Sequence, residues 1–94
     1  MGLGYSLTED IRFRNGIILD RNFGTYELPR FSSVPKIETV LLDLKDEPAH
    51  GGGEPAIIIV GAVIANAIDD ATGARPFQLP MTPERVRKAI AVAT

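Results

Sequence analysis

The chain has 94 residues, of which 45% are hydrophobic and 23% are charged, so we expect it to form packed structure and not to be disordered throughout. Its length predicts a single domain or a fragment of one, residues 1–94, with too small a core for a deep cofactor cavity. The formal net charge of −2, without a basic patch, argues against nucleic acid as a partner, and the absence of cysteine excludes disulfides, thiolate metal ligands and iron–sulfur ligation.

The N-terminal residues predict no secretory signal, because no basic stretch precedes an apolar one. The longest apolar run, residues 55–65, has 11 residues, whereas a membrane-spanning helix needs about 20. We therefore expect no membrane association and a cytoplasmic location.

Residues 9–19 predict a β-hairpin, because apolar and polar residues alternate on either side of the pair Asn15-Gly16. The stretch before it, residues 2–8, suits the end of a helix whose earlier turns are missing. Two glycines at the start of a chain nucleate a helix poorly, so this stretch hints at truncation.

Residues 20–35 predict an ordered loop, since proline, glycine, asparagine and serine interrupt the chain and Phe23, Tyr26 and Phe31 are expected to pin it to the core. The next stretch, residues 36–44, is rich in isoleucine, valine and leucine. This composition predicts a strand with at least one covered face.

A helix is expected over residues 55–72. Its β-branched start favours a strand by propensity, but its length, Pro55 in the first turn and Gly73 as a C-terminal cap favour a helix. A helix that is apolar on nearly every side must be buried on almost all of them.

The C-terminal part predicts a short strand at residues 77–79 and a second helix that runs to about Ala93. Thr82 suits the N-cap of this helix and Pro83 its first position. The fold class is therefore α+β: a small domain fragment with a β-hairpin plus one or two further strands, packed on a buried helix and a C-terminal helix.

Glu54 follows the glycines Gly51, Gly52 and Gly53 and directly precedes the first long predicted helix. A helix start stabilises a carboxylate whereas burial disfavours its charge, so such a glutamate can act as a general base. The glycines would let the backbone approach a bulky ligand. The pattern by itself favours the plainer reading, a flexible linker followed by a helix-start acid.

Three stretches taken together are more specific: Gly-Gly-Gly-Glu-Pro at residues 51–55, Ala-Asn-Ala-Ile-Asp-Asp-Ala-Thr-Gly at 65–73 and Leu-Pro-Met-Thr-Pro-Glu at 79–84. They resemble the end of the molybdopterin-binding subunit of the xanthine oxidase family, near its aldehyde-oxidase-like and isoquinoline 1-oxidoreductase β-subunit-like members. Residues 2–9 and 22–29 carry further pieces of the same resemblance in the same order, so it covers nearly the whole chain.

The resemblance implies a hydroxylase that inserts a water-derived oxygen into a C–H bond of an aldehyde or an N-heterocycle. Its cofactor would be a molybdenum ion held by a pyranopterin, bound mostly by residues absent from this chain. Glu54 matches the glutamate that serves the family as general base. Gly52 and Gly53 match the loop beside the molybdenum ligands and would contact the cofactor.

The same resemblance implies two partners, namely the remainder of the molybdenum-binding subunit and an iron–sulfur subunit. The chain alone would then be inactive, and exposed apolar surface on its long helix would favour self-association. The alternative is a non-catalytic interaction module or a truncated remnant of the family.

Polar residues of the long helix have plainer interpretations. Asp69 and Asp70 are adjacent, point about 100° apart on a helix, and therefore predict a polar face and not a carboxylate pair. Asn66 lies among apolar residues and is expected to be a buried amide bonded to backbone.

Overall fold

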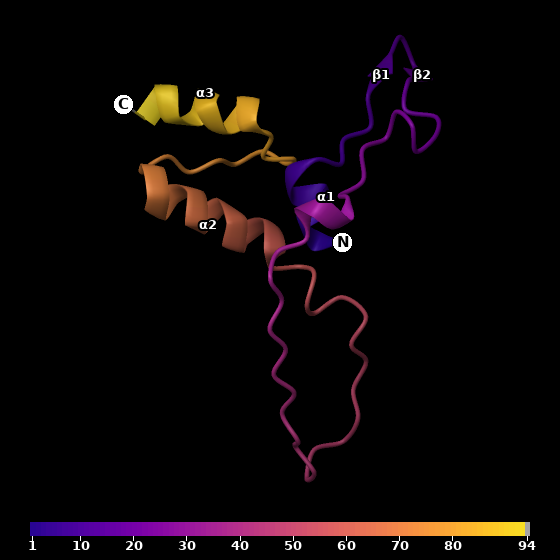
Figure 1. Cartoon of the computed structure of the whole chain (residues 1–94), viewed down its shortest axis with the longest axis vertical. Helices are drawn as coiled ribbons and strands as arrows, with labels where there is room; N and C mark the ends of the chain where they lie inside the picture. Colours follow the sequence, from indigo (N-terminus) through magenta and orange to yellow (C-terminus); the bar gives the residue numbers. More distant parts are fainter. Residues whose placement is uncertain (94) are drawn as a thin grey trace.

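The computed structural model describes residues 1–93 (Figure 1). The elements in chain order are α1 (Gly2–Leu7), β1 (Phe13–Arg14), β2 (Ile17–Ile18), a 3₁₀ helix η1 (Phe31–Ser33), α2 (Val60–Thr72) and α3 (Pro83–Ala93). The radius of gyration is 17.0 Å, larger than the roughly 12 Å expected for a compact chain of this length. The molecule is open because a hairpin and a long loop project from a small centre.

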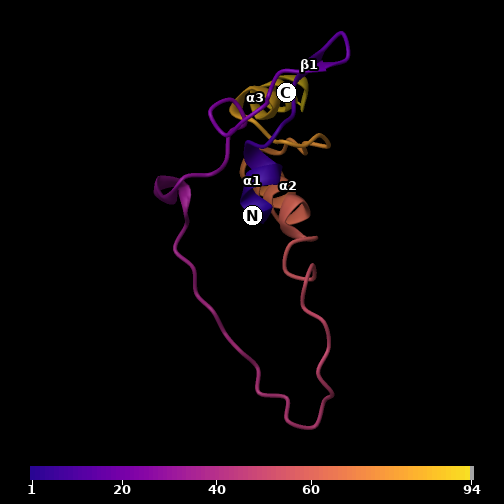
Figure 2. The ribbon, with the colours of Figure 1, turned by 90° about the vertical axis from the view of Figure 1, so that its right-hand side faces the viewer.

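Both views place α1 at this centre (Figures 1 and 2). The hairpin extends from it at one end, the loop that contains residues 34–56 extends at the other, and the segment after α2 runs between α2 and α3. The predicted α+β class is confirmed by a two-stranded antiparallel sheet together with helices.

The hairpin has the predicted position. Phe13 pairs with Ile18 and Arg14 with Ile17, and the two turn residues between them, Asn15 and Gly16, have φ angles of 51° and 77°. Asparagine and glycine adopt these left-handed backbone angles with little strain. The residues Asn15-Gly16 were therefore enough to predict the turn.

The further predicted strands are not formed. Residues 36–44 and 77–79 have extended or irregular backbone, and the described chain contains no strand besides β1 and β2. A strand needs a neighbour for its backbone hydrogen bonds, and residues 1–93 do not provide one.

The centre is a contact between α1, the start of α2 and the segment 74–81. Ser6 is fully buried, Ala74 and Met81 are 1% and 3% exposed, and the Met81 N–H donates to the Ser6 carbonyl oxygen at 2.6 Å. Gly2 has to be small here, because a β-carbon on it would lie 2.6 Å from Val60 Cγ2. This centre is too small to cover the helices around it.

Helix α2 begins at Val60, five residues later than predicted, after turns at residues 55–59. The β-branched start delays it, since such side chains lower helix propensity. It ends as predicted at Gly73, which has a φ of 71° and donates its N–H to the Asp69 carbonyl oxygen at 2.7 Å. The expected burial is wrong for this chain alone, because α2 has no buried residue and Val63 is 55% exposed.

Helix α3 follows the prediction closely. Thr82 Oγ1 accepts a hydrogen bond from the Arg85 N–H at 3.3 Å, which is the N-cap arrangement, and Pro83 is the first helical residue. The Arg85 guanidinium ties the helix to the rest of the molecule by donating to the Pro80 carbonyl oxygen at 2.9 Å and to Asp10 at 3.0 Å.

None of the helices formed by residues 1–93 is both long enough and apolar enough to span a lipid bilayer.

Candidate functional site

Glu54 lies on the long loop just before the turns that lead into α2. Its carbonyl oxygen accepts hydrogen bonds from the Ile57 N–H at 2.8 Å and the Ile58 N–H at 3.3 Å, so its main chain starts the first turn. Its side chain is exposed and has no partner among residues 1–93. The main chain of Glu54 is thus held in place while its carboxylate remains available.

One tether connects this turn to the centre of the molecule. The Tyr5 hydroxyl on α1 donates to the Ile57 carbonyl oxygen, three residues after Glu54. Ile57 is half-buried, whereas every residue from 27 to 56 is exposed. Tyr5 therefore marks where the loop joins the folded part, and Glu54 lies just outside that point.

The glycines Gly51, Gly52 and Gly53 are not required by the chain itself. A β-carbon on any of them would meet no atom within 4 Å, and none of them has a positive φ. Close packing and left-handed backbone, which explain other glycines, are therefore absent here. A side chain at any of these three positions would therefore meet no steric obstacle within residues 1–93.

The fit to a molybdenum–pyranopterin group can be judged from these residues. The loop has free space and backbone N–H groups, but it has no opposing wall, and the described residues contain no group of three or more His, Cys, Asp or Glu side chains able to hold a metal ion. His50 beside the glycines is exposed. Residues 1–93 by themselves therefore do not enclose a site for the group.

The larger cavities of the described chain lie elsewhere. One of about 440 Å³ lies between α3 and the segment after α2, where Arg75, Phe77 and Lys88 contribute to its lining. It does not include the glycine loop or Glu54. The structure thus keeps Gly52, Gly53 and Glu54 together by adjacency in sequence but brings no distant side chain to them.

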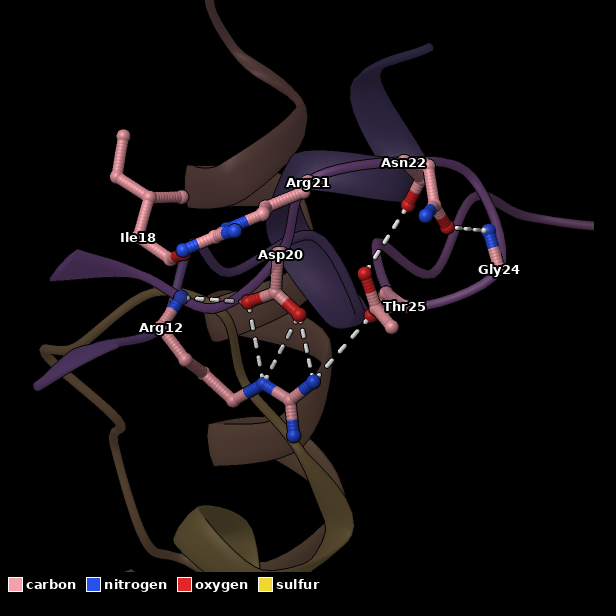
Figure 3. A network of polar contacts seen from close by, with 7 residues as sticks. All are labelled: Arg12, Ile18, Asp20, Arg21, Asn22, Gly24 and Thr25. Atoms are coloured by element: carbon pink, nitrogen blue, oxygen red, sulfur yellow. Dashed lines mark hydrogen bonds and ion pairs between the residues drawn. The ribbon is translucent and has the colours of Figure 1, made fainter.

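A polar network at the base of the hairpin was not predicted (Figure 3). The Arg12 N–H donates to Asp20 Oδ2 at 2.6 Å, and the Arg12 guanidinium donates to both carboxylate oxygens, with Nη2 2.5 Å from Oδ1. The side-chain hydrogen bond from Arg12 is the main reason why the pKa of Asp20 is lowered, and the same bond raises the pKa of Arg12. The sequence feature that could have predicted this contact is the pair of opposite charges, Arg12 and Asp20, on the two sides of the hairpin turn.

The aromatic anchors of the loop are fewer than expected. Tyr26 is half-buried, and its hydroxyl donates to Glu9 Oε2 at 2.6 Å, which raises the pKa of Tyr26. Phe23 and Phe31 are 76% and 98% exposed, so the prediction that they pin the loop is wrong for this chain alone. Residues 1–93 thus leave most of both rings uncovered.

The polar face of α2 is held by a residue beyond its end. Arg75 donates to Asn66 Oδ1 and, at 3.2 Å, to Asp69 Oδ2. Asn66 is therefore an exposed partner of a guanidinium and not the buried, backbone-bonded amide that was expected. Asp69 pairs with Arg75 and not with Asp70, in agreement with the predicted polar face.

Known proteins similar to this chain are parts of oxidoreductases. A nicotinate dehydrogenase subunit of Pseudomonas putida is 40% identical over 84 residues, which are 89% of this chain and 7% of that protein. The putative xanthine dehydrogenase molybdenum-binding subunit of Escherichia coli is 35% identical over 92% of this chain and 12% of its own length. The β-subunit of isoquinoline 1-oxidoreductase from Brevundimonas diminuta is 33% identical over 87% of this chain and 10% of its own length. None of the known protein-family models matches the chain.

The chain belongs to the family of molybdenum-binding subunits found in xanthine dehydrogenase, aldehyde oxidoreductase and isoquinoline 1-oxidoreductase. It spans only between 7% and 13% of the length of these relatives.

Proposed function

We propose that the chain is the base-carrying part of a molybdenum-dependent hydroxylase or dehydrogenase that oxidises an aldehyde or an N-heterocycle with water as the oxygen source. The observation that carries the proposal is identity of 33–40% with parts of known oxidoreductases over most of this chain. Nicotinate and isoquinoline are N-heterocycles, and a third relative is an aldehyde oxidoreductase, so their names support this substrate class.

In this proposal Glu54 is the general base. The molybdenum–pyranopterin group supplies a two-electron oxidation when it is bound. Glu54 accepts and holds a proton at its carboxylate, for which its exposed, unpartnered side chain is suited. Gly52 and Gly53 let the main chain lie close to the group, since neither carries a side chain nor has neighbours that demand glycine.

The remaining parts of the site come from partners in this proposal. The remainder of the molybdenum-binding subunit supplies the wall that faces Glu54, and an iron–sulfur subunit receives the electrons. The relatives that act on nicotinate and isoquinoline are each named as one subunit of an enzyme, and this chain has no cysteine with which to hold such a cluster. We expect residues 1–94 alone to be inactive.

The test is the substitution Glu54→Gln in the assembled enzyme, isolated from its own cells. We expect kcat to fall by about 10²–10⁴-fold, the usual contribution of a positioned base, at unchanged molybdenum content. Glu47→Gln is the matched control, because Glu47 is an exposed acid on the other side of the glycines. Turnover of the Glu54 variant within a few-fold of the control would refute the assignment.

Recovery of the chain from its cells distinguishes the proposed enzyme part from the alternative, which is a non-catalytic interaction module or a remnant of the family. Native mass spectrometry of the tagged chain, combined with elemental analysis, should find a large partner and stoichiometric molybdenum. A chain without metal or partner would favour the remnant. The exposed Val63 on α2 and Phe31 in the loop support association with a partner.

A further inference from the structure

Residues 36–44 contain a run of large apolar side chains that are exposed. The side chains of Val40, Leu41 and Leu42 are 84%, 88% and 77% exposed. The main chain has no regular secondary structure and runs away from the centre of the molecule (Figures 1 and 2), and residues 36–43 make no backbone hydrogen bond within the described chain. Three consecutive large apolar side chains in water are unfavourable by about 1.5–3 kcal/mol each relative to burial, so this segment lacks a covering surface.

We propose that residues 36–44 add as a strand to the edge of a β-sheet in the remainder of the molybdenum-binding subunit. This inference rests on the proposed function, which supplies that partner. Successive side chains of an extended chain point to opposite faces, so Val40 and Leu42 face one side and Leu41 the other. Both faces are therefore apolar at the middle of the segment, as in a strand that is covered on both sides.

The charges of the segment favour an apolar sheet over a charged surface. Lys36 Nζ lies 2.6 Å from Glu38, and Lys45 Nζ lies 3.4 Å from Asp43. Each pair is two residues apart, which places its members on one face of an extended chain. Within each pair the two charges neutralise each other. The partner surface therefore needs no charge of its own and has to offer apolar contacts and backbone hydrogen bonds.

The size of the relatives supports the remainder of the subunit as the occupant. At least 87% of the length of each compared relative lies outside the part that matches this chain, since the match covers at most 13%. That portion is large enough to contain a sheet with a covering layer. Within residues 1–93, the strands that a second copy presents in a sheet are β1 and β2, which have two residues each.

Strand addition would also fix the loop that carries Glu54. The segment ends at Leu44, whose carbonyl oxygen accepts a hydrogen bond from the Glu47 N–H at 3.2 Å in a turn. Residues 48–53 then connect this turn to Glu54, and α2 holds the other side. With the strand in place, both ends of the glycine loop are anchored.

Hydrogen–deuterium exchange tests the inference, measured by mass spectrometry on the chain alone and on the molybdenum-containing complex recovered from cells. We expect the amides of residues 37–43 to exchange about 100-fold more slowly in the complex. Residues 20–25 serve as an internal reference in the same spectra. Equal exchange of residues 37–43 in both samples would overturn the inference and leave the proposed function intact.

Two proline substitutions provide a second readout. Leu41→Pro removes a backbone donor in the middle of the strand and should reduce recovery of the complex at least about tenfold. Lys45→Pro is the control, because a turn from Leu44 to Glu47 accepts proline at its second position. Normal assembly of the Leu41 variant would contradict the inference.

The remaining outcomes separate the two proposals. Slow exchange in a complex that lacks molybdenum would support strand addition and overturn the proposed function. Slow exchange that develops only on concentrating the chain alone would show a second copy as the occupant and would overturn the inference.

Discussion

Arg12 and Asp20 close the base of the hairpin through four hydrogen bonds, one from the Arg12 main chain and three from its guanidinium. The Asp20 side chain has no exposed surface, whereas the Arg12 side chain is 63% exposed. The guanidinium covers the carboxylate on one side, and the Thr25 carbonyl oxygen accepts a further bond from it at 3.4 Å. The hairpin is therefore anchored at its base while its tip extends into solvent.

Acid should loosen this anchor. The pKa of Asp20 is lowered, so the stabilisation is present above the ordinary aspartate value near 3.8 and is lost as the pH falls through the lower folded-state value. NMR of the Arg12 and Leu19 amides during acidification should show the loss. Asp20→Asn should show it already at neutral pH, whereas Asp46→Asn, a change at an exposed loop residue, should behave as wild type.

High pH should weaken a second contact, the hydrogen bond between Tyr26 and Glu9. Tyr26 donates to Glu9, and its pKa is raised, so this contact contributes stability below the ordinary tyrosine value near 10.0 and loses it as the pH rises through the higher folded-state value. Near-ultraviolet absorbance should reveal a late tyrosinate transition that disappears in Tyr26→Phe. Glu9→Gln should move the transition towards its ordinary position, and an unchanged transition in that variant would contradict the assignment.

Two glycines should differ in how substitution by alanine affects the stability of the chain. Gly2→Ala would place a β-carbon 2.6 Å from Val60 Cγ2, so we expect the contact between α1 and α2 to weaken by about 1–3 kcal/mol. Gly53→Ala meets no atom within 4 Å and should leave the unfolding free energy of the chain nearly unchanged. Urea unfolding checks both, and equal effects would contradict the packing described.

The Gly53→Ala variant should affect activity without affecting stability. In the assembled enzyme, Gly53→Ala should lower activity because its β-carbon would lie between the main chain and the group that we propose binds there. Full activity of this variant would remove the reason for assigning Gly53 to the cofactor.

The start of α3 should depend on one hydroxyl. Thr82→Ala removes the side chain that accepts the Arg85 N–H and should reduce the stability of the helix by about 1 kcal/mol. Thr82→Ser retains the acceptor and is the matched control. Circular dichroism should show reduced helicity for the alanine variant only, and equal helicity in both would argue against the cap.

Short-range signals predicted much of the structure. Asn15-Gly16 determines the hairpin turn, and Gly73 and Thr82 mark the helix end and the helix start, because each acts through its own φ angle or a neighbouring N–H. The prediction placed the start of α2 too early, at Pro55 and not at Val60. It gave too little weight to the low helix propensity of the β-branched residues that follow Pro55. The Arg12–Asp20 pair was missed because spacing alone does not identify which charges meet across a turn.

The sequence by itself determined the turn, the caps and the family, since these depend on residue type and order alone, and its resemblance to that family is the reason for proposing Glu54 as the base. Only the tertiary structure decided that residues 36–44 have no neighbouring strand, that α2 is not buried and that the glycine loop has no wall. The physical reason is that burial and strand pairing each need two surfaces, so residue type and order within one segment cannot determine them.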